Sequence, residues 1–308
     1  DQPGAPGQDE VAAFLDEHPH VTCVRAGPGW WGEHRPRGLN ERQCTNATTV
    51  AHLLADVPAT AGSDPWVFHV DGDEVVRIDR AALAGVPDDV RAVRLAPREA
   101  VSKAVWDGEP TLFKAPLGEA DLRLLHTLGA IGEATNRAYF HGHLQGNTGA
   151  RPDRATWLGL HRALAADGSP VAGHDDEQHL ELFHYESYSG AEFVRKWSEM
   201  TTSGPRASFR AGRAAVADAV RTVLEKELDA QATRDLLLRL HAHTTMDDAA
   251  LLVDLGLAVE TDPLAGTHEP QTLPSPVATA LHEGLEALRG ADKSDFYAGS
   301  SASSADRT

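Results

Sequence analysis

The densest group of residues that could do chemistry lies between His174 and Tyr188. Three histidines and five carboxylates fall within His174 to Glu186. If this stretch is helical, Glu181 and His184 share one face with Glu177, and Tyr188 continues that face by one turn. The spacing predicts a helix over 176–198 that presents a row of carboxylate and imidazole groups, the donors that metal sites and acid–base sites use.

Glu181 and His184 have the Glu-x-x-His spacing that helical bundles use to hold iron or manganese. Such bundles need further ligands from other helices, and Glu133 and His126 lie seven residues apart on one face of a helix expected near 118–140. The sequence therefore indicates a divalent metal ion held by Glu181, His184, Glu133 and His126. The alternative is an acidic helix face in solvent, with histidines that play no ligand role.

A second group of polar residues follows in the glycine-rich segment from His141 to Arg151. Glycines allow the backbone to turn and to approach a ligand closely. We expect His141, His143 and Tyr188 to be catalytic, and Asn147 and Arg151 to bind substrate, with Arg151 pairing a carboxylate or phosphate. An ordinary connection between two helices explains the same residues without any function.

Two adjacent tryptophans, Trp30 and Trp31, stand in a loop that also carries His34 and Arg35. Large aromatic side chains in a loop are unfavourable in water unless they bind a ligand or pack against another part of the chain. Substrate binding by Trp30 and Trp31 and docking of the loop onto the helical part of the protein are both open.

Composition limits the class of protein. A chain of 308 residues with 41% hydrophobic residues can bury a substantial core, so we expect a folded, soluble protein. A net charge of −18 argues against nucleic acid as a partner, because binding to phosphate backbones depends on lysine and arginine. The sequence contains no apolar run of membrane-spanning length.

The two cysteines, Cys23 and Cys44, are too few for a disulfide scaffold, which favours a reducing, cytoplasmic location. A single bridge between them stays open.

The pattern along the chain predicts an α+β protein. Residues 9–115 indicate a small mixed α/β region, which includes a hairpin of two strands, 66–70 and 74–78, turning at Asp71-Gly72-Asp73. Residues 116–290 indicate a predominantly helical region. Residues 1–8 and 291–308 have the composition of disordered tails. The helices expected beyond residue 116 cover 118–140, 154–166, 176–198, 206–229, 233–243, 246–255 and 275–289.

Together these features favour an enzyme that acts on a small molecule or peptide through a histidine and carboxylate pocket in the helical half. A metal ion such as non-haem iron would be its cofactor. The alternative is a non-catalytic binding or regulatory protein with an acidic surface. Neither the substrate nor the oligomeric state follows from these residues.

Overall fold

The computed structural model describes residues 7–57, 65–202, 211–266 and 273–297. The largest sheet has five strands in the order β11-β5-β4-β10-β2. In this sheet β10 runs parallel to β4 and antiparallel to the edge strand β2. The bounds are β2 Glu74–Ile78, β4 Ala96–Ala100, β5 Leu112–Lys114, β10 Leu180–His184 and β11 Ala258–Glu260.

Two smaller sheets complete the β structure. The four-stranded sheet has the order β1-β6-β3-β9, and β7 pairs with β8 in a two-stranded sheet. Their bounds are β1 Val67–Phe68, β3 Ala92–Arg94, β6 Thr148–Ala150, β7 Thr156–Leu158, β8 Ala163–Ala165 and β9 Gly173–Asp175. The apolar core between the two larger sheets is formed by side chains such as Val93, Leu95, Leu180 and Leu182.

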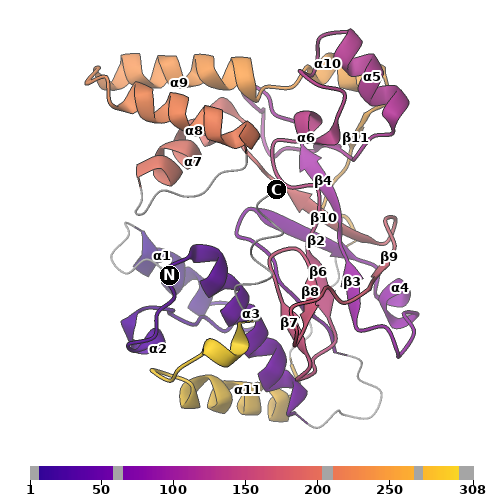
Figure 1. Cartoon of the computed structure of the whole chain (residues 1–308), viewed down its shortest axis with the longest axis vertical. Coiled ribbons are helices and arrows are strands. Elements are labelled where there is room, and N and C mark those ends of the chain that lie inside the picture. The colour runs from indigo at the N-terminus through magenta and orange to yellow at the C-terminus, as the bar shows by residue number, and fades with distance from the viewer. Residues whose placement is uncertain (1–6, 58–64, 203–210, 267–272, 298–308) are drawn as a thin grey trace.

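One group of helices lies at the top of the molecule, and a second group lies at the lower left, beside the smaller sheets (Figure 1). One group, at the top in Figure 1, contains α5 Glu119–Thr127, α6 Asn136–Tyr139, α7 Gly190–Thr202, α8 Ala211–Leu224, α9 Ala230–Thr244 and α10 Ala249–Asp254. The group at the lower left contains α1 Gln8–Asp16, α2 Pro28–Trp31, α3 Leu39–Ala55 and α11 Ser275–Ala287. A short helix α4, Arg80–Ala84, follows β2, and a single 3-10 turn, Ser294–Phe296, lies near the C-terminal end.

The predicted fold class is wrong in its second half. Residues 116–290 are not predominantly helical, because the segment from Thr148 to His184 contains β6 to β10. All five residues of β10 are buried, and a strand buried on both faces loses the polar–apolar alternation that identifies strands in a sequence. The protein is a mixed α/β structure whose sheets occupy its N-terminal and middle parts.

The same error accounts for several individual elements. The helix expected over 154–166 is the β7–β8 pair, and the helix expected over 176–198 is β10 followed by α7. The predicted hairpin at Asp71-Gly72-Asp73 is also wrong, since β1 pairs with β6 and β2 pairs with β10. This acidic turn therefore connects two different sheets.

The predicted helices near 233–243, 246–255 and 275–289 are confirmed as α9, α10 and α11. The helix expected over 118–140 is interrupted between α5 and α6, and part of the one expected over 206–229 lies outside the described residues. Cys23 and Cys44 are both free thiols.

Strands from both sides of the boundary predicted at 115–116 share the large sheet, and the division into domains itself stays a prediction. Of the two tails predicted to be disordered, residues 1–6 and 298–308 lie outside the described residues. Within the described part of the chain, no helix has the length and apolar character needed to cross a bilayer.

Candidate functional site

The site is built on a row of four charged or polar residues that crosses the large sheet. Glu74 of β2 is in register with His184 of β10, His184 with Glu99 of β4, and Glu99 with Lys114 of β5. Paired residues on neighbouring strands project to the same face of a sheet, so the four side chains lie side by side. All four side chains are almost completely buried. Buried charges require partners, and the surrounding chain supplies them.

The glycine-rich segment that follows α6 crosses this row. The backbone N–H groups of His141 and Gly142 donate to the two carboxylate oxygens of Glu99, at 2.8 and 2.5 Å. The Nε2 atom of His143 lies 2.8 Å from Glu74, and the Asn147 side chain donates to the same carboxylate at 2.5 Å. Glu99 and Glu74 thus fix the path of this segment, and this places His141 and His143 at the site.

Gly142 has no space for a side chain. A Cβ atom at this position would lie 2.4 Å from ring atoms of His184 and 2.7 Å from Glu99 Oε2. We expect Gly142→Ala to destabilise the protein by about 1–3 kcal/mol, the usual cost of overpacking, and to displace His184. Urea unfolding would measure the loss, with Gly132→Ala as the control, because a Cβ there meets nothing within 4 Å. Equal stability of the two variants would contradict the packing described.

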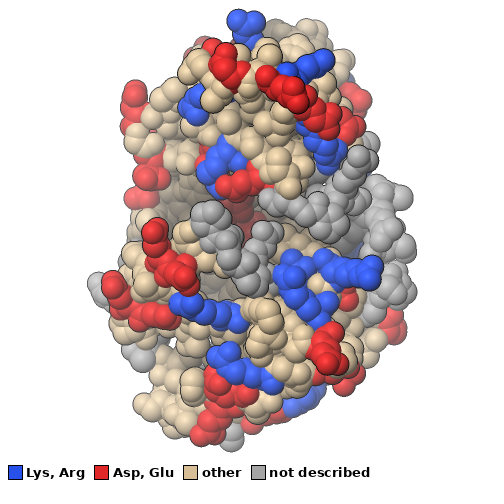
Figure 2. Space-filling model, turned by 90° about the vertical axis from the view of Figure 1, so that its left-hand side faces the viewer, with Lys and Arg blue, Asp and Glu red and all other residues tan. Residues whose placement is uncertain are grey.

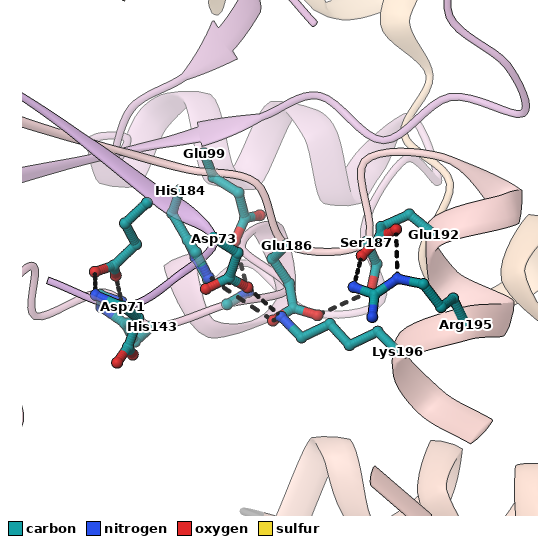
Figure 3. Close-up of polar contacts among 12 residues, drawn as sticks. Asp71, Asp73, Glu99, His143, His184, Glu186, Ser187, Glu192, Arg195 and Lys196 are labelled. Carbon is teal, nitrogen blue, oxygen red and sulfur yellow. Dashed lines mark hydrogen bonds and ion pairs between the residues drawn. The ribbon is translucent and has the colours of Figure 1, made fainter. Parts of the chain in front are cut away.

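Two more carboxylates approach His184 from the opposite side (Figure 3). Asp73 and Glu186 each lie 2.7 Å from the ammonium group of Lys196 on α7, which sits between them. The Nε2 atom of His184 is 3.6 Å from Asp73 and 3.9 Å from Glu186. The guanidinium of Arg213 on α8 lies 3.3 Å from Glu186. Two carboxylates and one imidazole, all possible metal ligands, therefore converge on one point. The ammonium group of Lys196 already lies there.

The charges of this cluster shift the pKa values of its members. Burial opposes ionisation of Glu186, but Arg213, Lys196 and His184 outweigh it and lower its pKa to about 2. Burial likewise disfavours the protonated form of His184, yet the nearby carboxylates of Asp73, Glu186 and Glu99 raise the pKa of the imidazole. The pKa of Asp73 is lowered, chiefly by His184 and Lys196 acting against burial.

These shifts fix how stability should depend on pH. A carboxylate with a lowered pKa in the folded state stabilises the fold above its ordinary pKa, and that contribution is lost as the pH falls through the folded value. For Glu186 the loss should occur between about pH 4.5 and 2. Urea unfolding at a series of pH values should show stability falling in this window. Glu186→Gln should flatten the dependence, and an unchanged slope in that variant would contradict the assignment.

Two groups of side chains among the described residues have the spacing of a metal site, namely Asp73, His184 and Glu186, and Glu74, His143 and His184. In the second group, Glu74 already accepts hydrogen bonds from His143, from Asn147 and from the backbone of Asp71. In the first group, the cationic partners of Asp73 and Glu186 are long, flexible side chains, and Glu186 also accepts a hydrogen bond from the Ser187 hydroxyl at 2.8 Å. Asp73 is 37% exposed, so this group is also open to solvent, as a catalytic metal site requires. The first group is the better candidate.

The imidazole groups carry a further sign of an incomplete site. The Nδ1 atoms of His143 and His184 are buried and have no hydrogen-bond partner among the described residues. Buried polar atoms in native proteins are nearly always paired, so such atoms mark a place where a ligand, ion or water belongs. Both residues belong to the second candidate group, whereas the His184 atom that faces Asp73 and Glu186 in the first group is Nε2 and not Nδ1.

A cavity of about 200 Å³ adjoins this cluster. Its lining includes Glu186, His141, Arg137, Arg213 and the hydroxyl-bearing Thr245. Figure 2 shows a hollow near the middle of the face that carries α7 and α8, with acidic side chains in its floor and basic side chains near its rim. The cavity combines groups that bind anions with one carboxylate of the candidate metal group.

The structure does not bring together the metal ligands predicted from the sequence. Glu181 and His184 are three residues apart in a strand, and they therefore point to opposite faces of the sheet. Glu181 forms ion pairs with Arg77 and, at 3.0 Å, with Arg98. His126 and Glu133 are exposed and lie on a different part of the chain, where the His126 ring lies 3.2 Å from the carbonyl oxygen of nearby Ile131. Of the predicted ligand set, only His184 lies at the site.

The other predicted residues divide between the site and the scaffold. His141, His143 and Asn147 lie at the charged row. Arg151 donates to the carbonyls of Val90 and Val86 and stacks on a tryptophan, which makes it a structural residue.

Trp30 and Trp31 are buried against α11, so docking rather than ligand binding explains them. Tyr188 is partly exposed and packs against Tyr185, and its carbonyl accepts a hydrogen bond from Trp106.

Sequence reasoning missed most of the charged residues of the site. The missed residues are Asp73, Glu74, Glu99, Lys114, Glu186, Lys196, Arg213 and Asp247. One signal was present: the consecutive run Asp71-Gly72-Asp73-Glu74 places three carboxylates within four residues between two strands. The Asp-Gly pair in this run is also typical of a tight turn, which is what it predicts by itself.

Comparison of the chain with known protein families, curated proteins and solved structures identifies no match.

Proposed function

We propose that this protein is an enzyme that depends on a divalent metal ion and acts on a small molecule carrying phosphate. The observation that supports it most strongly is the convergence of Asp73, His184 and Glu186 on one point. The ammonium of Lys196 lies 2.7 Å from both carboxylates at this point. A position that attracts one cation so closely is favourable for a metal ion, and Lys196 has the length to move aside.

The donor set favours Mg²⁺ or Mn²⁺ over the non-haem iron suggested by the sequence pattern. Two carboxylates are hard oxygen ligands, which suit Mg²⁺ and Mn²⁺, and a single imidazole is compatible with Mn²⁺. Non-haem iron sites commonly use two histidines and one carboxylate. Glu74, His143 and His184 have that composition, but the three hydrogen bonds that Glu74 accepts already occupy its oxygens.

The basic residues around the metal group support a phosphate-bearing substrate. Magnesium is usually held by one or two carboxylates together with substrate phosphates. When a metal ion neutralises Asp73 and Glu186, Lys196 and Arg213 lose their partners and become available to a second anion. The Nε atom of Arg213 is buried and has no hydrogen-bond partner among the described residues. Arginine matches phosphate oxygens through paired N–H donors.

This arrangement is suited to transferring a group away from phosphate. The bond between the transferred group and a phosphate oxygen breaks, and its electron pair stays on that oxygen. A metal ion at Asp73, His184 and Glu186 would supply Lewis-acid stabilisation of the departing phosphate. Lys196 and Arg213 would add positive charge next to it. The acceptor, a hydroxyl group or water, forms the new bond and gives its proton to a base.

Phosphorus NMR tests this function directly. The full chain would be incubated with Mg²⁺ or Mn²⁺ and with phosphate monoesters, phosphodiesters and diphosphate diesters, each with and without an alcohol acceptor. We expect metal-dependent release of phosphate or of a phosphate-bearing leaving group from one of these classes. The release should disappear with EDTA and in Asp73→Asn, and it should persist in Glu177→Gln, where the altered carboxylate is 70% exposed. Equal release by both variants would overturn the proposal. Failure of the wild type to bind either metal would support a non-catalytic binding protein instead.

A further inference from the structure

A second charged network lies on the far side of Glu99 from His184. The ammonium of Lys114 is completely buried. It donates to the two oxygens of Asp247 at 2.8 and 2.9 Å and to the carbonyl of Tyr139 at 2.8 Å, and it lies 3.3 Å from Glu99. Asp247 lies in the turn between α9 and α10, far from Lys114 in the sequence. Its second oxygen accepts the backbone N–H of Ser102 at 2.8 Å. Asp247 is thus held in one position by Lys114 and by the backbone of Ser102.

Asp247 is also in contact with His141. The Nε2 atom of His141 lies 3.2 Å from Asp247 Oδ1, and His141 is one of the residues that line the cavity, together with Glu186 and Arg213. Because Asp247 is ionised by its contact with Lys114, it can only accept a hydrogen bond, so Nε2 must carry the proton. The other ring nitrogen, Nδ1, is then the proton acceptor of the neutral imidazole.

The charged groups around His141 come from several elements. Asp247 and Glu99 are negative and contact its side chain and backbone, whereas Lys114 is positive but already paired with both carboxylates. Arg137, Arg213 and Glu186 line the same cavity. His241 is close enough for its charge to act on His141, but burial, reinforced by His141, lowers the pKa of His241 to about 4, so His241 is neutral near pH 7.

We infer that His141 is the base that takes the proton of the acceptor in the cavity, and that Asp247 is a positioning residue that orients it. This inference rests on the proposed function, because it assumes that the cavity beside Glu186 receives the substrate. A carboxylate that fixes the tautomer of a catalytic histidine is a general device for such proton transfers. Lys114 and Ser102 hold Asp247 in place for this role.

Histidine NMR of the full chain tests the inference without a known substrate. Protein labelled with ¹⁵N at histidine would be titrated with acid, and His141→Gln would assign the His141 signals. We expect the neutral ring of His141 to be predominantly the Nε2–H tautomer. In Asp247→Asn, which removes the charge and keeps the shape, the share of the Nε2–H tautomer of His141 should fall. Two equally populated tautomers in the wild type would overturn the inference, even if Asp247→Asn does not fold.

A second experiment uses Mn²⁺ and inorganic phosphate as probes. It separates the proposed metal-dependent function from the role inferred for His141. Both His141→Gln and Asp247→Asn should bind Mn²⁺ as tightly as the wild type, because neither residue belongs to the metal group. Inorganic phosphate, added with diamagnetic Mg²⁺, should shift the His141 signals of the wild type. If the wild type binds the metal but phosphate does not shift the His141 signals, the inference is overturned and the proposed function stands. Absence of metal binding in the wild type would instead contradict the proposed function.

Discussion

Replacement of Lys114 by methionine should destabilise the protein by about 3–5 kcal/mol, the usual effect of removing one partner of a buried ion pair. Lys114 is completely buried and is the cation shared by Glu99 and Asp247, whose side chains are 1% and 9% exposed. Methionine fills a similar volume, so the loss comes mainly from two carboxylates left without their positive partner. Chemical unfolding at pH 7 would measure it.

The matched control for this prediction is Lys226→Met, because Lys226 is exposed just beyond α8. That substitution should change stability by no more than about 0.5 kcal/mol. A small and equal effect of both substitutions would show that Lys114 does not hold Glu99 and Asp247 in the way described. The double replacement Lys114→Met with Asp247→Asn should recover part of the loss, since it removes one of the unpaired charges.

Replacement of Asp73 by asparagine should weaken Mn²⁺ binding by more than about 100-fold, since even residues that only orient metal ligands change affinity by 10–100-fold. Asp73 is partly exposed, and asparagine keeps its shape, so the fold should be retained. Isothermal titration of the full chain with Mn²⁺ would measure the affinity, and circular dichroism would confirm the fold.

Glu177→Gln is the control for a general loss of negative charge, because Glu177 is an exposed carboxylate outside the metal group. It should bind Mn²⁺ with wild-type affinity. Affinity should also fall as the pH is lowered through the raised pKa of His184, because metal binding requires the neutral imidazole. Unchanged binding in Asp73→Asn would place the metal elsewhere.

Part of the site could be predicted from the sequence, because some of its residues are close together along the chain. His141, His143 and Asn147 occur within one short glycine-rich segment, and this local density indicated a functional loop. Their contacts with Glu99 and Glu74 could not be predicted, because those pairs are 42 to 73 residues apart and meet only through strand pairing.

The main error arose from β10. The residues around Glu181 and His184 fit a helical period of 3.6 residues, and in a helix both would lie on one face. In a strand the period is two, so the same residues separate, and His184 joins Glu74 and Glu99 across the sheet instead. The burial of every residue in β10 removed the alternation that would have distinguished the two structures. The helices α9, α10 and α11 were predicted correctly.

The most direct test of the metal site is a crystal of the full chain soaked in Mn²⁺, with anomalous scattering measured at the manganese edge. We expect one strong peak in contact with Asp73, Glu186 and the Nε2 atom of His184, and displacement of the Lys196 ammonium from its position between the two carboxylates. A manganese peak at Glu74 and His143 would contradict this metal site. Fully occupied manganese peaks elsewhere, with no peak at Asp73 and Glu186, would contradict it as well.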